Sequence, residues 1–213
     1  MKTIALILGI LTLQTALHAR PLFFAGLNAG ALATNKYTKP GIAGGAEIGL
    51  ETKYFGAAVQ GYGMTGKTKS EYTDATISLA PVMLAPYFVL PVHSSAGKKM
   101  GALRLGAGIG YVLAHYKLGP DVDDELNQGV PPGTTVSYKA SFDNGIGYQV
   151  GGGFDVHISR NFTIGTNINY LIFRTNAHET LEIRRTFSRT LIESTSEVNL
   201  DSLVAMASIK YYF

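Results

Sequence analysis

The chain has 213 residues, the length of one domain or of two small ones. Charged residues make up 15% of it, whereas ordinary soluble proteins carry ~25%, and nothing after the N-terminus is an apolar run of the ~18 residues that a membrane-spanning helix requires. The net charge of +3 comes without a stripe of Lys and Arg, so we expect no nucleic-acid partner. The absence of cysteine excludes disulfides and thiolate metal sites.

Residues 1–20 have the layout of a secretory signal. One Lys is followed by an apolar run from Ile4 to Leu13 and then by a region of small residues. Cleavage after Ala19 is predicted, and cleavage after Ala16 is the rival. We therefore expect a signal peptide over residues 1–19 and one mature domain over residues 20–213; the alternative is an uncleaved anchor helix or a buried helix.

The rest of the chain alternates apolar with small or polar residues, which predicts strands separated by turn-forming segments. We expect eight strands, at 22–34, 42–53, 55 to beyond 64, 75–92, 101–117, 136–158, 162 onward and 203–213. The fourth contains Pro81, Pro86 and Pro91, and proline removes a donor from the ladder. Longer polar loops at 35–41, 65–75, 119–137 and 177–200 alternate with short turns, so we expect the loops outside the cell and both termini in the periplasm.

The two faces of these strands differ in an unusual way. One face carries large apolar residues, whereas the other is rich in Gly, Ala, Ser and Asn rather than in the Lys, Glu and Thr of a solvated sheet face. Small residues fit the crowded interior of an eight-stranded barrel. The pattern therefore predicts an all-β fold, an eight-stranded antiparallel up-and-down transmembrane β-barrel with its apolar face toward lipid. A soluble sandwich or lipocalin-like barrel is the alternative.

The charges within strands fall on the small-residue face, where Glu47, Arg104, Asp155 and Lys210 all lie. An isolated charge inside a packed barrel is costly, so these groups should pair. We predict a lumenal charge network of Glu47, Arg104 and Lys210. A packed interior is the favoured interpretation, and an ion gate is the alternative.

The alternation continues to the last residue of the chain, Phe213, so strand eight must pair with strand one to close the sheet. With its signal peptide, its glycine-rich strands "LRLGAGIGYVL" and "GYQVGGGFDVHI", and this last strand, the whole chain resembles the small eight-stranded outer-membrane barrels of Gram-negative bacteria, the opacity-protein and OmpW-like superfamily. The resemblance implies an outer-membrane location in contact with membrane lipid and lipopolysaccharide. It also implies that Phe213, Tyr211 and Ile209 form the signal read by the barrel-assembly machinery.

Sequence motifs for catalysis or cofactor binding are weak. His157 and Ser159 resemble the His-x-Ser pair of one family of lipid A enzymes, but they fall at a short turn expected on the periplasmic side. The acidic segment 121–132 lacks the glycine and the final glutamate of a calcium loop. We therefore expect no cofactor, no metal and no catalytic residues.

The expected function is that of a non-enzymatic outer-membrane barrel with a structural or surface-interaction role through its extracellular loops. The sequence does not identify a host or extracellular ligand. One alternative is a narrow pore or a lateral-diffusion transporter for small hydrophobic molecules. Another is a lipid-A-modifying enzyme of the outer membrane.

Overall fold

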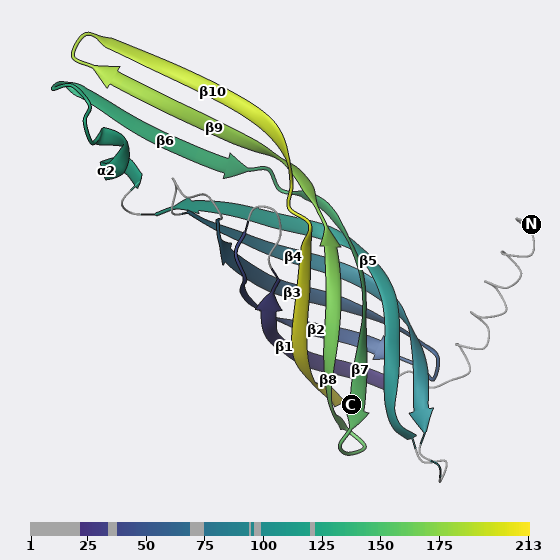
Figure 1. Cartoon of the computed structure of the whole chain (residues 1–213). Helices are drawn as coiled ribbons and strands as arrows, with labels where there is room; N and C mark the ends of the chain where they lie inside the picture. Colours follow the sequence, from purple (N-terminus) through teal and green to yellow (C-terminus); the bar gives the residue numbers. More distant parts are fainter. Residues whose placement is uncertain (1–21, 34–37, 69–74, 94, 96–98, 120–121) are drawn as a thin grey trace, which may run out of the picture.

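The computed structural model describes residues 22–33, 38–68, 75–93, 95, 99–119 and 122–213, so the expected signal peptide lies outside the described residues (Figure 1). Within the described part, no helix has the length and apolar character needed to cross a membrane. The elements are β1 (Leu22–Leu32), β2 (Gly41–Glu51), β3 (Phe55–Lys67), β4 (Ala75–His93), β5 (Lys99–Leu118), α2 (Val122–Asn127), β6 (Thr134–Phe142), β7 (Gly145–His157), β8 (Phe162–Ile172), β9 (Arg174–Arg185), β10 (Ser188–Asn199) and β11 (Ser202–Tyr212).

Eight of these strands close into an antiparallel barrel in the order β1-β11-β8-β7-β5-β4-β3-β2. The last strand, β11, pairs with β1 from Phe24↔Tyr212 to Leu32↔Val204. The amide of Phe213 then donates to the carbonyl of Phe23 at 2.9 Å. The predicted closed eight-stranded barrel is therefore confirmed, including closure by the C-terminal strand.

The two faces of the wall point as predicted. Large apolar side chains of all eight barrel strands project outward and are exposed, as in Leu27, Ile48, Leu84, Ile109 and Ile168. Among the inward residues, Gly110 of β5 lies beside the Met83 side chain and Gly151 of β7 beside that of Asn169, so these glycines leave room for longer side chains from neighbouring strands. The exposed apolar wall suits a hydrocarbon environment, and closure satisfies the backbone groups that lipid cannot bond.

The expected sixth strand at 136–158 is wrong as a single strand. The chain forms β6, breaks at Asp143 and Asn144, and starts again as β7. Only β7 belongs to the barrel, because β6 joins β9 and β10 in a separate three-stranded sheet of order β10-β9-β6. Apolar residues occupy even-numbered positions on both sides of the break. The alternation therefore continues through it and gives no sign that one strand ends and another begins.

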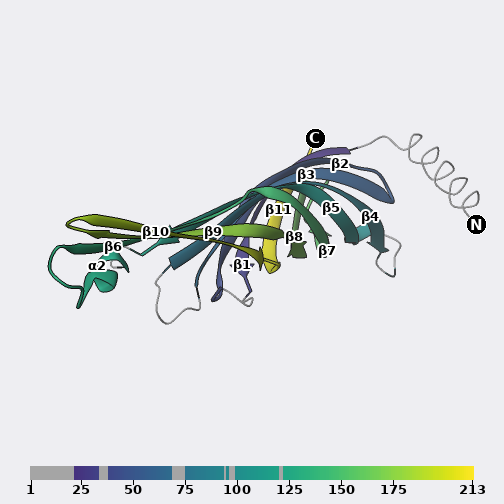
Figure 2. The same ribbon diagram turned by 90° about the horizontal axis from the view of Figure 1, so that it is seen from above.

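The separate sheet extends from one end of the barrel, at the upper left of Figure 1, and Figure 2 shows it beyond the barrel from a second direction. We call this the loop end, and the opposite end, with the turns at 52–54 and 158–161, the short-turn end. The expected loop 177–200 is mostly the β9–β10 hairpin, and the expected loop 119–137 contains α2 and the start of β6.

Apolar clusters fill both ends of the barrel interior. The cluster at the loop end is Leu32, Ala43, Tyr62, Met64, Ile77, Leu79, Met83, Val112, Leu171, Phe173, Leu200, Val204 and Met206. The cluster at the short-turn end is Phe24, Ala58, Tyr87, Val89, Ala102 and Tyr212. Polar and charged side chains occupy the space between them.

Deletion of Phe213 tests whether this residue serves assembly more than stability. Phe213 is 73% exposed, and its ring contacts that of Tyr211 with the centroids 5.2 Å apart. The deletion removes one backbone hydrogen bond, worth about 1 kcal/mol, so the refolded barrel should unfold in urea almost like the wild type. If the terminal aromatic residue is an assembly signal, the folded fraction in outer membranes should fall severalfold, as measured by heat-modifiable gel migration.

Phe88→Ala is the matched control, since Phe88 is also an exposed aromatic residue on the outer wall. It should leave the folded fraction in cells unchanged. Equal yields of the Phe213 deletion and the Phe88→Ala variant would contradict the assembly role.

Candidate functional site

Charged side chains from four strands meet inside the barrel. Glu47 and Glu51 come from β2, Arg104 from β5, Asp155 from β7 and Lys210 from β11, and all five are buried. Each lies on the inward face of its strand, because side chains alternate between the two faces. Barrel closure brings them together although they are far apart in the sequence.

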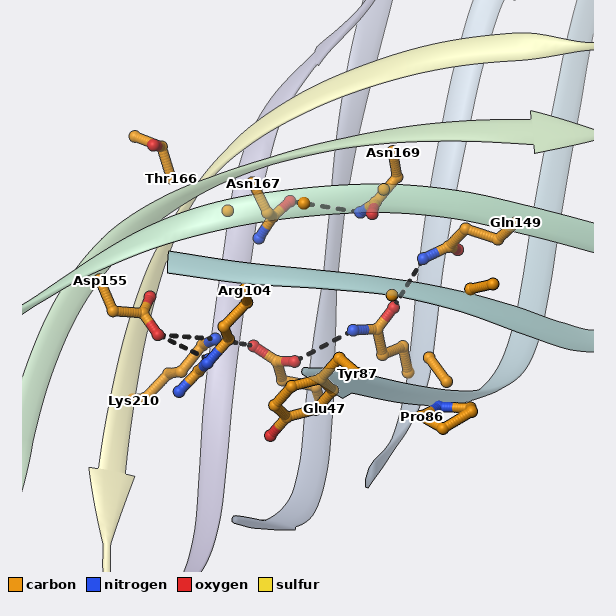
Figure 3. A pocket seen from close by; sticks show the side chains of 17 residues that line it. Glu47, Pro86, Tyr87, Arg104, Gln149, Asp155, Thr166, Asn167, Asn169 and Lys210 are labelled. Atoms are coloured by element: carbon orange, nitrogen blue, oxygen red, sulfur yellow. Dashed lines mark hydrogen bonds and ion pairs between the residues drawn. The ribbon is translucent and has the colours of Figure 1, made fainter. Parts of the chain in front are cut away.

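Direct ion pairs connect these five groups. Figure 3 shows Glu47, Arg104, Asp155 and Lys210. Arg104 Nη2 lies 2.5 Å from Glu51 Oε2, and Arg104 Nη1 lies 2.6 Å from Asp155 Oδ2. Lys210 Nζ lies 3.2 Å from Glu47 Oε1 and 3.5 Å from Asp155 Oδ2. Asp155 therefore links the two cations, and the network contains three carboxylates and two basic groups.

The structure places the three predicted network residues in one cluster, although Arg104 does not pair with Glu47 or Lys210 directly. Lys210 contacts Glu47, whereas Arg104 contacts Glu51 and Asp155. The predicted network did not include Glu51 and Asp155. Both lie on the small-residue face, so the same signal could have found them; the choice of partners depends on strand neighbours that spacing does not reveal.

Aromatic rings surround the two cations. The Arg104 guanidinium lies 5.6 Å from the ring centroid of Phe24 and 5.3 Å from that of Tyr87, and Lys210 Nζ lies 5.6 Å from Phe24. Arg104 Nη2 also donates to the Tyr212 hydroxyl at 2.5 Å. Cation–π contacts strengthen when they are desolvated. The rings therefore hold the charges in place and seal the short-turn end.

A chain of hydrogen-bonded side chains leads from the charged groups toward the loop end. Gln60 donates to Glu47 at 3.2 Å, Gln149 donates to Gln60 at 3.0 Å, and the Tyr62 hydroxyl donates to Gln149 at 2.8 Å. A cavity of about 60 Å³ lies among these groups, and such a volume holds only a few water molecules. In the described residues the interior is therefore a packed, paired plug, with no space for a wide aqueous channel.

The structure gives His157 and Ser159 separate local roles. His157 Nδ1 lies 3.0 Å from the Thr163 hydroxyl, while the Ser159 hydroxyl accepts from the amides of Asn161 and Phe162 in the β7–β8 turn. Among the described residues, no group of His, Asp or Glu has an arrangement suited to a metal ion.

Two interruptions of the barrel wall lie along β4. The β3–β4 pairing skips Ala80 and Pro81, although both still pair with β5. The β4–β5 pairing skips Ala85 and Pro86, although both still pair with β3. Proline has no N–H, so each proline weakens the ladder on the side that its nitrogen faces.

A mostly apolar cavity of about 620 Å³ lies beside the first interruption. Its lining includes the buried side chains of Met64 and Leu79 and also the exposed side chains of Ile42 and Leu113. The cavity therefore reaches from the interior packing to the outer wall near the loop end. Its remaining lining residues are Ala43, Gly44, Gly63, Thr65, Ser78, Ala80, Ala114, His115 and Asn144.

Side-chain contacts fix the base of the three-stranded sheet to the barrel. The Phe142 ring of β6 meets the Tyr116 ring of β5 edge-on, with centroids 5.5 Å apart. The Thr175 hydroxyl donates to the carbonyl of Asp143 at 2.6 Å. Asp143 also bonds His178 Nε2 at 3.1 Å, and hydrogen bonds from His178 and Asn176 lower the pKa of the Asp143 carboxyl.

Farther out, the two faces of this sheet differ. One face carries Glu182 of β9 between Arg184 and Arg189, and the hydrogen bond from Arg184 is the main cause of a lowered Glu182 pKa. By the strand register, the opposite face carries Val136, Tyr138, Leu181, Ile183 and Ile192. The sheet thus presents a charged face and an apolar face beyond the barrel.

Arg104→Met tests the role of the ion pairs inside the barrel. The change leaves Glu51 and Asp155 buried without their main partner, which costs about 3–5 kcal/mol. Urea unfolding of the refolded protein in lipid vesicles should show this loss. The triple variant Arg104→Met/Glu51→Gln/Asp155→Asn should recover much of it, because no unpaired charge remains at that position.

Arg160→Met, in the exposed β7–β8 turn, is the matched control and should change the unfolding free energy by less than about 0.5 kcal/mol. Equal losses for Arg104→Met and Arg160→Met would show that the buried pairs do not stabilise the barrel.

Comparisons with known proteins give relatives by structure. No family model matches the chain, and no curated protein sequence matches it. The crystal structure of the outer membrane protein OprG from Pseudomonas aeruginosa superposes with a TM-score of 0.56 and 14% identity, over 92% of this chain and 96% of OprG. That of Neisserial surface protein A gives a TM-score of 0.53 and 14% identity, over 91% and 97%.

The Escherichia coli outer membrane protein W is also matched, with 18% identity and a TM-score of 0.43, over 92% of this chain and all of that protein. The alignments with OprG and Neisserial surface protein A cover nearly the whole of each chain. Together with the closed barrel and its exposed apolar wall, they show that the chain has the fold of the small eight-stranded outer-membrane β-barrels.

Proposed function

We propose that this protein is a non-enzymatic outer-membrane barrel that acts in surface interaction, and that the sheet β6-β9-β10 is its interaction element. The observation that carries the proposal is the combination of a plugged barrel with an ordered sheet beyond its loop end. Outer-membrane barrels have short periplasmic turns and longer extracellular loops, which puts this sheet outside the cell.

The order of the sheet supports a binding role. The β9–β10 hairpin keeps one register from Ser188↔Arg185 to Asn199↔Arg174 without a shift, and the Phe142–Tyr116 contact anchors the sheet at its base. A surface that is already ordered loses less conformational entropy when a partner binds. A plugged barrel with such a sheet is suited to presenting a surface.

The proposal includes two further sets of partners. Membrane lipid and lipopolysaccharide surround the apolar wall. The barrel-assembly machinery reads Ile209, Tyr211 and Phe213 during biogenesis, and the outward exposure of all three side chains supports this role.

Removal of the hairpin tests the surface role. A variant in which residues 177–197 are replaced by an Asn-Gly turn should still assemble, because the barrel strands do not depend on β9 or β10 for pairing. Cells with the wild-type protein should adhere severalfold better than cells with this variant to at least one of three surfaces: immobilised fibronectin, dextran sulfate or cultured epithelial cells. Equal adherence on all three would overturn the proposal.

A second candidate function is lateral passage of small apolar molecules between the cavity of about 620 Å³ and the membrane. The interrupted β3–β4 ladder beside this cavity favours it, because Pro81 withholds a hydrogen-bond donor there. The filled interior nearer the short-turn end is the reason that it ranks second.

Pro81→Ala separates this candidate from the first. Alanine restores an N–H toward β3, so uptake of the apolar fluorescent probe N-phenylnaphthylamine by whole cells should fall severalfold if the gap is a passage. Pro91→Ala is the control, since Pro91 lies beyond the last β3–β4 pair. Equal uptake in the two variants would exclude the passage.

A further inference from the structure

The β9–β10 hairpin ends in a two-residue turn, Thr186-Phe187, at the end of the sheet farthest from the barrel (Figures 1 and 2). Strand β9 has 12 residues, so at ~3.3 Å per residue the turn lies about 40 Å beyond the barrel rim. The turn at 131–133 lies beside it, because a Cβ on Gly133 would be 2.7 Å from the Thr186 hydroxyl oxygen. We call residues 131–133 and 184–189 the distal tip.

The fold of the hairpin does not account for Phe187. The residue is 99% exposed, so its ring packs against nothing in the described part of the chain. Hairpin turns of two residues favour Gly, Asn and Asp, and phenylalanine supplies none of their backbone freedom. Pro131 and Pro132 are also exposed at this end. The distal tip therefore presents a small apolar surface to the surroundings.

The same tip is basic. Arg184, Arg185 and Arg189 are all exposed there. Glu182 pairs with both Arg184 and Arg189, the latter at 2.7 Å. Three guanidinium groups and one carboxylate leave the tip with two excess positive charges.

The sides of the sheet have the opposite charge. The exposed carboxylates of the hairpin lie closer to the barrel than Glu182 does, and these are Glu179, Glu193 and Glu197. Helix α2, with the exposed Asp124 and Glu125, is also set back from the tip toward the barrel in both views (Figures 1 and 2). An anionic partner is therefore repelled along the sides of the sheet and attracted to its end.

We propose that the distal tip binds end-on to a facing bilayer that contains anionic phospholipid. This inference rests on the proposed function, since it names the partner of the same sheet. Aromatic rings settle at the membrane–water interface, and arginines near an anionic surface add to the binding. The Phe187 ring enters the interface, and the arginines lie at the level of the lipid phosphates.

The apolar part of the tip favours a bilayer over a sulfated polysaccharide. A sulfated chain satisfies the arginines but leaves the Phe187 ring in water, whereas the interface accepts both. The membrane that holds the barrel is out of reach, because the tip lies about 40 Å beyond the rim. One tip is a small contact, and the many copies on a cell surface bind a facing membrane together.

A single tryptophan tests the insertion directly, because the natural chain contains none. Phe187→Trp, refolded in phosphatidylcholine nanodiscs, is mixed with vesicles of equal parts phosphatidylserine and phosphatidylcholine. Its emission should shift to shorter wavelength, and brominated lipid in the vesicles should quench it severalfold. Tyr54→Trp, at an exposed position of the short-turn end, is the control and should show neither effect.

Cosedimentation with the same vesicles tests the two chemical components. The wild type should bind them severalfold better than vesicles of phosphatidylcholine alone. Phe187→Ser should lower this binding severalfold, and so should Arg185→Ser/Arg189→Ser, which leaves Arg184 paired with Glu182.

Lys53→Ser/Arg160→Ser is the matched control for the charges, since it removes two exposed cations from the short-turn end. It should leave vesicle binding unchanged. An equal loss in the two double variants would show that net charge, and not the distal tip, determines the binding.

The proposal is overturned if the Phe187→Trp emission does not respond to anionic vesicles while heat-modifiable migration shows a folded barrel. Arginine-dependent binding of dextran sulfate without that response would identify a polyanionic sugar as the partner instead. This failure is distinguishable from failure of the proposed function, because hairpin-dependent adherence without vesicle binding would leave the surface role intact and exclude the bilayer.

Discussion

Closure of the sheet is the constraint on which the rest of the molecule depends. Hydrocarbon offers no hydrogen-bond partner, so each spanning strand must have a neighbour on both sides. The pairing of β11 with β1 removes the last two edges. Once eight strands close, the interior is narrow, and it can hold long side chains only where facing residues are small. The glycine-rich inner faces of β5 and β7 follow from this geometry.

The same closure makes the charged plug possible. Five ionisable groups lie within the membrane-spanning region because each finds a partner on another strand, and the rings of Phe24, Tyr87 and Tyr212 exclude water around Arg104. A barrel filled in this way has little capacity for passage along its axis. Its remaining candidates for function are therefore the wall beside Pro81 and the sheet outside.

The sequence predicted the faces and the closed barrel well because one physical rule, alternation between lipid and a crowded interior, acts on every strand. For the same reason it predicted that Glu47, Arg104, Asp155 and Lys210 turn inward, although it passed over Glu51. It did not predict that Arg104 pairs with Glu51, because strand neighbours and stagger decide contacts between residues 53 positions apart. The break between β6 and β7 was missed because Phe142 and Ile146, on its two sides, both fit the same alternation of apolar residues at even-numbered positions.

Outside the membrane a sheet is not required to close, and the three-stranded sheet accordingly has two edges. Water can bond an open edge, so β6, β9 and β10 need not close into a barrel. An open edge nevertheless invites another strand, and the chain opposes this on the two sides by different means. On one side the Asn127 side chain occupies the β6 edge against Val136. On the other side β10 carries the exposed charges of Arg189, Glu193 and Glu197, and charged side chains on an edge strand oppose the addition of a further strand.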